Sequence, residues 1–477
     1  MQIKGLVKLI KVGKIKGMSC NSQAVRNGFI FIAVKGTKED GGRFIDEAIA
    51  KGAKAVVCDL GVKRNNLTDI PLIRVKDTRL AAARLAAEFY GNPSRKLKVI
   101  GITGTCGKTT ITYILEAMLN ESGFETAVIG TVNYRFKNKV LPAKNTTPGP
   151  LELQSLMMGM AKEKIDYVAV EVSSHALDQA RVSGIDFCSA IFTNLTQDHL
   201  DYHKTIKSYF LAKSKLFSGL SKEAFAVLNY DDKYFPLLKG LTKAEVITYG
   251  LSAGSQVRAE NIEYGLKSTK FLLILPSGRQ KIETTLIGRH NIYNILAASA
   301  WGYKEGLPLK KIKTAINNFR FVPGRTEPVS CKKGFFVFVD YAHTEDALRN
   351  VLVALRNLSS RRIITVFGCG GERDALKRPK MGKVATELSD FVIITNDNPR
   401  SEKPKQIIRD IERGIRKKNY SIVLDRKEAI RQSLSLAKKG DIVLVAGKGH
   451  EGYQILGDNI IRFDDRKEIS LCLKSMS

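Results

Sequence analysis

Short β-branched strands alternate with helical patterns along almost the whole chain. This alternation predicts an α/β architecture with mainly parallel sheets. The chain has 477 residues, and domains of ~100–200 residues each predict about three of them. The turn signal Val-Pro-Gly-Arg at 322–325 indicates a boundary. We therefore expect three units, at residues 1–96, 97–323 and 324–477.

The expected strands are short apolar runs, and many of them end where glycine, charge or histidine begins. In the first two units we expect strands within 29–34, 53–60, 166–173, 188–195 and 223–231, a strand, turn and helix within 96–110, a hairpin-like segment at 255–287 and a helix at 288–303. In the last unit we expect strands within 335–343, 362–371, 390–400 and 441–451. Ligands gather at the carboxyl ends of strands in open α/β sheets, so binding residues are expected there.

Composition places the chain among ordinary globular proteins, with 44% hydrophobic and 26% charged residues. Its seven cysteines are scattered, and no pair has CxxC spacing. Neither a disulfide framework nor a thiolate zinc site is therefore indicated. The first 17 residues alternate apolar residues with lysines and contain no long apolar run, which predicts neither a signal peptide nor membrane insertion. We expect a protein of the reducing cytoplasm.

The net charge of +30 has several possible origins. It is compatible with nucleic-acid binding, with attraction to a membrane surface and with a polyanionic small substrate. The basic residues run through the whole chain and form no single block. A lysine-rich solvated surface is the simpler interpretation, and charge alone does not choose among these alternatives.

The segment GTCGKTT at 104–110 lies between a strand and a helix. Its glycines let backbone amides approach phosphate oxygens, and the following helix N-terminus favours anions. Lys108 would reach the β- and γ-phosphates of a nucleotide, and the Thr109 hydroxyl would bind magnesium. The strict spacing of a phosphate loop is not met, because Ile102 stands where the first glycine belongs. A structural turn without a ligand is the alternative.

Acidic residues and histidines follow two further strands. Glu171 ends one strand, where a carboxylate suits a magnesium contact beside the phosphate loop; a strand-end charge that faces water is the alternative. Asp198, His199, Asp201 and His203 come directly after the next strand. A polar cluster in that position is typical of a binding site.

Lys213 lies in the expected helix 209–217, whose apolar face includes Phe210, Leu211 and Phe217. From this pattern alone, Lys213 is a surface lysine whose stem covers apolar neighbours.

Eleven segments in order resemble the Mur ligase family and span nearly the whole chain: GTCGKTT, NTTPGPLELQ, EVSSHALDQARV, NLTQDHLDYH, YFLAKSKLF, GRHNIYN, VPGRTE, VDYAHT, GCGGERD, DNPR and GKGHE. The resemblance implies three domains. They are a UDP-sugar domain at 1–96, a central domain at 97–323 with an ATPase-like parallel sheet, and a Rossmann-like amino-acid domain at 324–477. It also implies an ATP-dependent, ADP-forming ligase of peptidoglycan synthesis.

The family assigns roles to matching residues. Residues that match its ATP site are Gly104, Thr105, Cys106, Gly107, Lys108, Thr109, Thr110, Asn294, Arg325 and Asp340. Catalytic residues would be Lys108, Glu171, His199 and Lys213, and ligands of two magnesium ions would be Thr109, Glu171, His199 and Lys213. Lys213 matches a lysine that carbon dioxide converts to a carbamate, which turns a cation into an anion able to bind magnesium. The reaction needs the neutral amine, which is scarce for a lysine with a pKa of about 10.4.

The resemblance implies UDP-N-acetylmuramoyl-L-alanyl-D-glutamate as one substrate. Its expected contacts are Ser22, Thr37, Lys38, Glu39, Asn145, Thr146, Thr147, Ser173, Gln179 and Arg181. Three positions depart from the family pattern. Asn21-Ser22-Gln23 stands for the usual Asp-Ser-Arg, which leaves the uridine contacts open, while Cys106 replaces an asparagine and Glu345 a proline.

The incoming amino acid would meet Arg373, Asp397, Asn398, Pro399, Arg400, Gly447 and Glu451. DNPR resembles the version that selects meso-diaminopimelate, whose distal carboxylate suits the bidentate fork of Arg400. L-Lysine lacks that carboxylate. We therefore expect diaminopimelate, with L-lysine as the alternative.

The implied reaction forms an acyl phosphate on D-glutamate, which the amine of the amino acid then attacks. A sibling ligase that adds the next dipeptide and a folylpolyglutamate synthetase are alternatives, against which DNPR and GKGHE argue. A basic nucleotide-binding protein that holds nucleic acid is the remote alternative, because it leaves Lys213, Arg400 and Glu451 without a role. We expect no nucleic-acid partner and a monomer.

Overall fold

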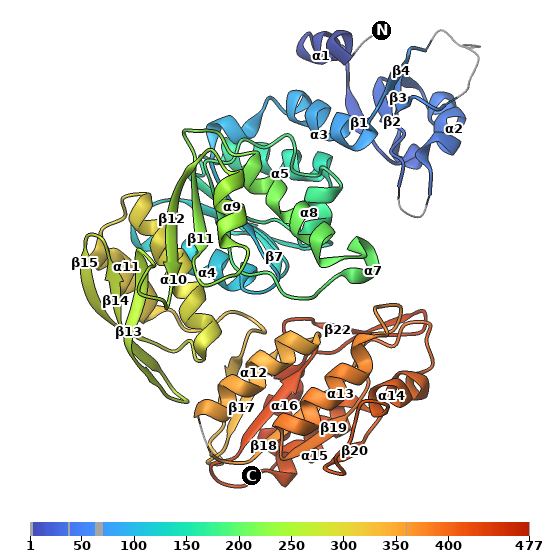
Figure 1. The fold of residues 1–477 in the computed structure, drawn as a ribbon. Helices are drawn as coiled ribbons and strands as arrows, with labels where there is room; N and C mark the ends of the chain where they lie inside the picture. Colours follow the sequence, from blue (N-terminus) through green and yellow to red (C-terminus); the bar gives the residue numbers. More distant parts are fainter. Residues whose placement is uncertain (1–2, 37–38, 63–69, 359, 477) are drawn as a thin grey trace.

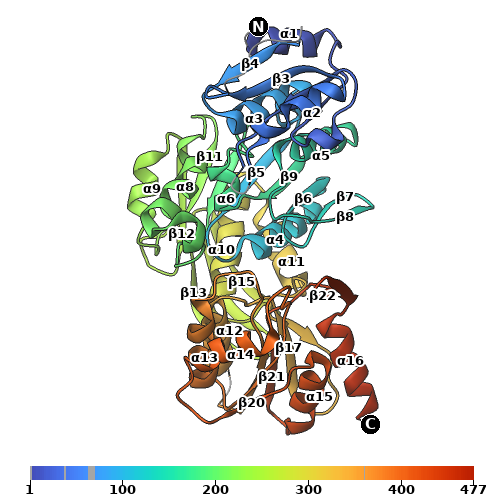
Figure 2. The ribbon, with the colours of Figure 1, turned by 90° about the vertical axis from the view of Figure 1, so that its right-hand side faces the viewer.

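The structure, a computed structural model, describes residues 3–36, 39–62, 70–358 and 360–476. Its strands form three main sheets and one small hairpin. The parts that hold these sheets follow one another along the long axis of the molecule, with the N-terminal part at one end and the C-terminal part at the other (Figures 1 and 2). The α/β architecture with mainly parallel sheets that the sequence predicts is confirmed.

The N-terminal sheet is wholly parallel, in the order β1-β2-β3-β4. Its strands are β1 (Gly17–Ser19), β2 (Phe29–Ile32), β3 (Ala53–Asp59) and β4 (Leu72–Val75). The helices around it are α1 (Ile3–Lys11), α2 (Ile45–Ala50) and α3 (Thr78–Phe89), with short 3-10 turns at Ser22–Ala24, Gly41–Phe44 and Pro93–Lys96. Leu6 and Ile10 of α1 and Leu85 of α3 share one apolar core with Ile30 and Val57 of the sheet.

The central sheet has eleven strands in the order β15-β14-β13-β12-β11-β10-β5-β9-β6-β7-β8. Seven neighbouring strands are mutually parallel: β5 (Lys98–Thr103), β6 (Thr126–Ile129), β9 (Tyr167–Glu171), β10 (Ser189–Phe192), β11 (Phe225–Asn229), β12 (Glu245–Gly250) and β13 (Val257–Tyr264). Antiparallel pairing adds β7 (Asn133–Phe136) and β8 (Lys139–Pro142) at one end, and β14 (Thr269–Leu275) and β15 (Gly278–Thr284) at the other.

The segment 255–287 differs from the expected hairpin, since it forms the three strands β13, β14 and β15. The second reversal falls at Pro276-Ser277, between β14 and β15. Proline and serine favour turns, so they divide the second half of the segment into two strands.

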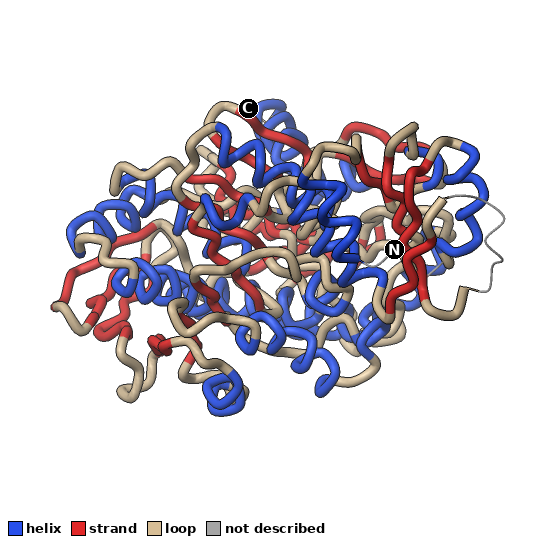
Figure 3. Tube along the Cα trace, turned by 90° about the horizontal axis from the view of Figure 1, so that it is seen from above, coloured by secondary structure: helices blue, strands red, loops and turns tan. Residues whose placement is uncertain are grey.

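Helices pack against both faces of the central sheet, and Figure 3 distinguishes helices and strands by colour in a view from above. One face packs against α4 (Lys108–Glu121), α10 (Arg289–Lys304) and α11 (Leu309–Asn318). The other packs against α5 (Pro150–Lys162), α8 (Ile206–Ser218) and α9 (Phe235–Leu241), with the short helices α6 (Ser174–Asp178) and α7 (Leu200–His203) nearby. Burial on both faces explains why the parallel strands are continuous apolar runs.

The C-terminal sheet has the order β16-β17-β21-β18-β19-β20, and only β16 is antiparallel to its neighbour. Its strands are β16 (Glu327–Val329), β17 (Phe336–Asp340), β18 (Ile363–Phe367), β19 (Phe391–Ile394), β20 (Tyr420–Ile422) and β21 (Ile442–Ala446). The helices are α12 (Glu345–Leu358), α13 (Lys377–Leu388), α14 (Pro404–Glu412), α15 (Arg426–Leu436) and α16 (Asp465–Ser475). A hairpin of β22 (Tyr453–Leu456) and β23 (Asn459–Arg462) follows β21. Five parallel strands therefore have their carboxyl ends at one edge of this sheet.

Among the described residues, no helix combines the length and the apolar character needed to cross a membrane.

A buried ion pair joins α15 to α16. Arg426 and Asp465 are both 0% exposed, and two hydrogen bonds of 2.7 and 2.8 Å connect them. Asp465→Ala would leave the guanidinium buried without its carboxylate. We expect the free energy of unfolding to fall by about 3–5 kcal/mol, measured by urea denaturation. Arg431→Ala is the control, because the Arg431–Glu428 pair is exposed and its loss should cost ~0–1 kcal/mol. Equal losses in the two variants would contradict the expectation.

Candidate active site

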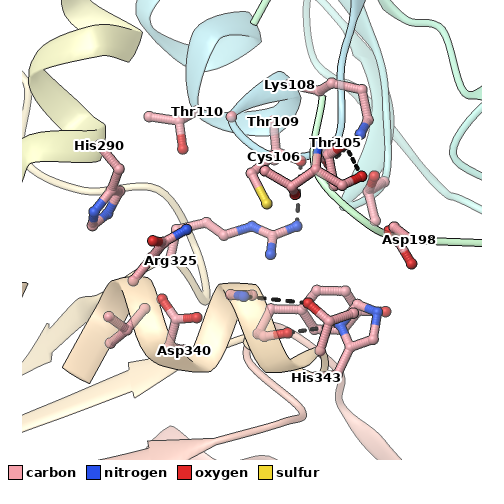
Figure 4. Close-up of a pocket in the computed structure, with 18 of the residues that line it drawn as sticks. Thr105, Cys106, Lys108, Thr109, Thr110, Asp198, His290, Arg325, Asp340 and His343 are labelled. Carbon is pink, nitrogen blue, oxygen red and sulfur yellow. Dashed lines mark hydrogen bonds between the residues drawn. The ribbon is translucent and has the colours of Figure 1, made fainter. Parts of the chain in front are cut away.

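A cavity of about 760 Å³ lies where the central and C-terminal sheets face each other. Figure 4 shows the phosphate loop and α4 on one side, and Asp340 and His343 of the C-terminal part on the other. The side chain of Arg325 reaches across the gap between them (Figure 4). The cavity therefore collects residues from two sheets that are far apart in sequence.

Glycine is required at two positions of the phosphate loop. Gly104 and Gly107 have φ angles of 149° and 93°, in the region that glycine favours. A Cβ at Gly104 would lie 1.8 Å from Thr193 Oγ1, and one at Gly107 would lie 2.4 Å from Asn294 Oδ1. The loop therefore packs directly against both neighbours, and its backbone leads into the N-terminus of α4.

Two lysines share one carbonyl of this loop. The Nζ atoms of Lys108 and Lys213 each donate to the oxygen of Gly104 at 2.8 Å. Lys213 is 1% exposed. The prediction from its helical pattern, that Lys213 is a surface lysine, is therefore wrong. Burial first, and then the charge of Lys108, hold the pKa of Lys213 well below its usual value. Leu211, expected on the apolar face of the same helix, is 50% exposed.

Glu171 is buried beside the phosphate loop. It is 1% exposed and accepts hydrogen bonds from Thr109 Oγ1 at 3.0 Å, from the Thr131 backbone N–H at 2.9 Å and from Thr131 Oγ1 at 2.9 Å. The alternative interpretation of Glu171, as a strand-end charge that faces water, is therefore wrong. Sequence reasoning missed Thr131, whose contact with Glu171 joins residues 40 positions apart.

The polar cluster after β10 divides between the cavity and the interior. Asp198, His199 and Asp201 line the cavity. His203 instead is 7% exposed and hydrogen-bonds through Nε2 to Ser174 Oγ at 3.0 Å. The ring of His199 lies 4.8 Å from that of His175, and burial lowers the pKa of His199 to about 4. His199 is therefore neutral at physiological pH and keeps a lone pair that a metal ion can use.

The oxygen donors around Thr109 and Glu171 suit magnesium, a hard cation. Within the described ranges, no group of three or more histidine, cysteine, aspartate or glutamate residues is arranged to hold a metal ion. The lowered pKa of Lys213 favours the neutral amine, which is the form that combines with carbon dioxide.

The other residues expected around ATP lie on α10, the 322–327 turn and β17. Asn294 is 5% exposed and donates to Asn291 Oδ1 at 3.1 Å. Arg325 donates to Thr109 Oγ1 at 3.4 Å and lies 4.7 Å from the centre of the Tyr341 ring. Asp340 accepts from the backbone and hydroxyl of Thr326, and burial raises its pKa. The structure thus brings Asn294, Arg325 and Asp340 to the same cavity as GTCGKTT.

Most residues expected at the sugar-nucleotide site form a second network, beside β9. Thr147 Oγ1 donates to the carbonyl of Glu171 at 2.7 Å and accepts from the backbone N–H of Ser173 at 3.0 Å. Arg181 donates to the carbonyl of Thr147 at 2.9 Å and to Gln179 Oε1 at 2.8 and 3.1 Å.

The neighbouring Thr146 contacts Thr131 through its hydroxyl at 3.1 Å, and Asn145 is exposed. The network therefore runs up to Glu171 and the phosphate loop.

The residues expected in the first unit are apart from this network. Ser22 Oγ donates to Glu47 Oε2 at 2.6 Å, and Glu39 is exposed. Asn21, where the family pattern has aspartate, accepts from the backbone N–H of Gln23 and so caps the 3-10 turn that starts at Ser22. Thr37 and Lys38 lie outside the described residues.

The residues expected around the amino acid lie at the carboxyl ends of β18, β19 and β21. Those that line the cavity are Arg373, Asp397, Asn398, Arg400, Gly447 and Glu451, while the neighbouring Pro399 is buried. Arg400 has a φ of 54° and donates through Nη1 to the carbonyl of Gly371 at 2.7 Å. This contact holds the guanidinium at the cavity and leaves other N–H groups for a ligand.

Sequence reasoning gave no role to several further cavity residues. These include His290, Tyr293, Tyr341, His343 and Lys377. All but Lys377 belong to the segments GRHNIYN and VDYAHT, so the motifs were the available signal.

Family comparisons identify the chain. The model described as Mur ligase middle domain matches residues 102–302, the Mur ligase glutamate ligase domain matches 324–449, and the Mur ligase family catalytic domain matches 14–90. The chain belongs to the Mur ligase family.

Its relatives include UDP-N-acetylmuramoyl-L-alanyl-D-glutamate–2,6-diaminopimelate ligases. That of Clostridium acetobutylicum is 44% identical over 97% of this chain and 95% of the relative. That of Geobacillus kaustophilus is 45% identical over 95% of this chain and 93% of the relative.

Solved structures show the same three-domain fold. A UDP-N-acetylmuramoyl-L-alanyl-D-glutamate–2,6-diaminopimelate ligase matches with a TM-score of 0.70 and 32% identity, over 97% of this chain and 95% of the other. The MurF ligase of Thermotoga maritima in complex with ADP matches in fold, with a TM-score of 0.65 and 20% identity over 96% and 98%. The expected central ATPase-like sheet and Rossmann-like C-terminal domain are those of the Mur ligase fold.

Proposed function

We propose that the protein is the ATP-dependent ligase that joins meso-diaminopimelate to the D-glutamate of UDP-N-acetylmuramoyl-L-alanyl-D-glutamate. The observation that carries the proposal is a single cavity with GTCGKTT on one wall and DNPR and GKGHE on the other. A phosphate-binding loop and an amino-acid site that share one cavity allow one active site to activate a carboxylate and deliver an amine to it. The similarity to diaminopimelate ligases supports this choice within the family.

The three units, 1–96, 97–323 and 324–477, divide the substrates among themselves in this proposal. The first two hold the sugar nucleotide, through Ser22, the 37–39 segment and the network around Thr147 and Arg181. The central unit holds the triphosphate on its loop, and Asn294, Arg325 and Asp340 contact the rest of ATP. The third unit holds diaminopimelate.

Two magnesium ions would be held by Thr109, Glu171, His199 and the carbamate of Lys213. When bound, they supply positive charge that stabilises the transferring phosphoryl group. The shared carbonyl of Gly104 supports the carbamate. Two ammonium groups there repel each other, whereas a carbamate beside Lys108 pairs with it.

The chain's own contribution is positioning and charge. The γ-carboxylate of D-glutamate attacks the γ-phosphate of ATP, ADP leaves, and the amine of diaminopimelate then displaces phosphate from the acyl phosphate. Lys108 would lie beside the phosphates in the first step and lower the repulsion between carboxylate and triphosphate. Holding three reactants in line can lower a barrier by up to ~7–11 kcal/mol, and closure of the third unit over the central one is the means.

The direct experiment is phosphate release from ATP with UDP-N-acetylmuramoyl-L-alanyl-D-glutamate and a panel of amino acids. We expect product only when the nucleotide, ATP and diaminopimelate are all present. Product with a muramyl tripeptide and a dipeptide instead would favour the sibling ligase. Filter binding with RNA and DNA across a salt series tests the remote alternative, because phosphate contacts give a steep salt dependence. The cytoplasmic location and the monomeric state stay predictions.

Selection of diaminopimelate should depend on Arg400. Its guanidinium would pair with the distal carboxylate, and leaving it desolvated beside L-lysine would cost ~1–3 kcal/mol. We expect the wild type to prefer diaminopimelate over L-lysine by roughly tenfold to a hundredfold in kcat/KM. Arg400→Ala should lose most of that preference, chiefly through weaker use of diaminopimelate, with ATP binding unchanged.

Arg409→Ala is the matched control, because this arginine lies on α14 and does not line the cavity. Equal use of the two amino acids by the wild type, or an undiminished preference in Arg400→Ala, would contradict the role of Arg400.

A further inference from the structure

A buried lysine lies behind the amino-acid wall of the cavity. Lys448 follows β21 and is 0% exposed. Its Nζ donates to Asn398 Oδ1 at 3.1 Å and to Glu451 Oε2 at 3.0 Å, and it lies 5.6 Å from the centre of the Tyr453 ring. An ammonium group has three N–H donors, and two of them are used on side chains that line the cavity, whereas Lys448 does not line it.

The two carboxylate oxygens of Glu451 have different hydrogen-bond partners. Oε2 accepts from Lys448 and from Asn398 Nδ2, at 3.0 and 2.9 Å. Among the residues that the structure describes, Oε1 has only a contact of 3.5 Å with the hydroxyl of Tyr341. Oε2 is therefore committed to the protein, and Oε1 keeps the capacity to accept from a ligand in the cavity.

Asn398 is fixed by the same lysine. Its Oδ1 accepts from Lys448 and from the backbone N–H of Ile455 at 3.0 Å, so its Nδ2 is directed at Glu451. Lys448 thus connects the loop after β19, the loop after β21 and the start of the β22–β23 hairpin. Buried charges cost free energy unless they are paired and hydrogen-bonded, and each group here satisfies another.

We propose that Lys448 is a positioning residue for the incoming amino acid. Its buried ammonium group holds Glu451 in the orientation in which Oε1 accepts a hydrogen bond from an ammonium group of that substrate. This inference rests on the proposed ligase function. Without the cation, Glu451 would lose the Oε2 partner that Lys448 supplies and would keep only the Asn398 amide at that oxygen. The amino acid would then bind to a carboxylate with several orientations.

The test is steady-state kinetics of Lys448→Met, which removes the charge and keeps the length of the side chain. The KM for diaminopimelate should rise by about tenfold or more, while the KM values for ATP and for the sugar nucleotide stay within about twofold. Lys448→Gln, which keeps uncharged amide N–H donors, should give an intermediate KM. Either variant suffices, provided that its circular dichroism shows a folded protein.

A double-mutant cycle separates positioning from general support of the fold. If Lys448 acts through Glu451, Lys448→Met combined with Glu451→Gln should raise the KM for diaminopimelate no more than the larger single change, since effects on independent sites multiply. Asp465→Asn is the control for destabilisation, because it weakens a buried pair of the same unit outside the cavity. It should lower stability and leave this KM unchanged.

The outcomes are distinct. A wild-type KM in folded Lys448→Met and Lys448→Gln, or multiplying effects in the cycle, overturns the positioning role while the wild-type ligase activity stands. A wild type that forms no product with any amino acid overturns the proposed function, and the role of Lys448 with it.

Discussion

Lys108→Ala is expected to lower kcat by about 10²–10³-fold or more, the range found when one preorganised charged or hydrogen-bonding group is removed from a transition state. In the structure Lys108 lies in the first turn of α4, lines the cavity and donates to the carbonyls of Gly104 and Thr105 at 2.8 and 2.9 Å. Two backbone contacts hold its ammonium at the loop, where the phosphates would lie. Alanine is a better helix former than most residues, so the fold should be kept.

The measurement is ligase turnover, together with thermal unfolding to show that the variant is folded. Lys8→Ala is a matched control, because Lys8 is an exposed lysine on α1, in the N-terminal part of the molecule. Ligase activity of Lys108→Ala equal to that of the wild type would refute the assignment of the phosphate loop.

Lys213→Ala should also be nearly inactive, with a loss of roughly 10²–10³-fold, because it would remove the proposed carbamate and, with it, the proposed magnesium ligand. The side chain is fully enclosed by α8, the phosphate loop and Tyr209, whose ring centre lies 4.6 Å from Nζ. Alanine leaves a space beside Gly104, and a short carboxylate such as formate could fill it. We therefore expect partial recovery of turnover with added formate.

Wild-type protein in ¹³C-bicarbonate should show a carbamate carbon signal that Lys213→Ala lacks. Lys215→Ala, two positions along the same helix and half exposed, should keep both the signal and the activity. Wild-type rates in Lys213→Ala across a range of magnesium concentrations would rule out the carbamate.

The architecture was predictable because a strand that is buried on both faces consists almost entirely of apolar residues. The strands β9, β10, β11 and β21 are buried along their whole length, and each appears as an apolar run. Short or exposed strands have no such apolar run. All four residues of β8 are exposed and β16 is only three residues long, and neither strand was predicted.

Side-chain environments were predictable only where a local rule applied. The glycines of GTCGKTT and the strand-end placement of Glu171 follow from local geometry. The burial of Lys213 does not, because its partner Gly104 is 109 positions away, and a helical pattern cannot show what a helix packs against. The resemblance to the family supplied that residue. Thr131 and Lys448 also contact residues far away in the chain, Glu171 and Asn398 respectively, and only the structure shows these contacts.

The eleven-stranded sheet has a consequence for aggregation. A sheet of this width ends in two edge strands, whose unpaired backbone groups can template pairing with another chain. One edge, β8, is four residues long, begins with Lys139 and ends with Pro142, which has no N–H to donate. The other, β15, carries the charged residues Arg279 and Lys281. Both edge strands therefore disfavour edge-to-edge association between molecules.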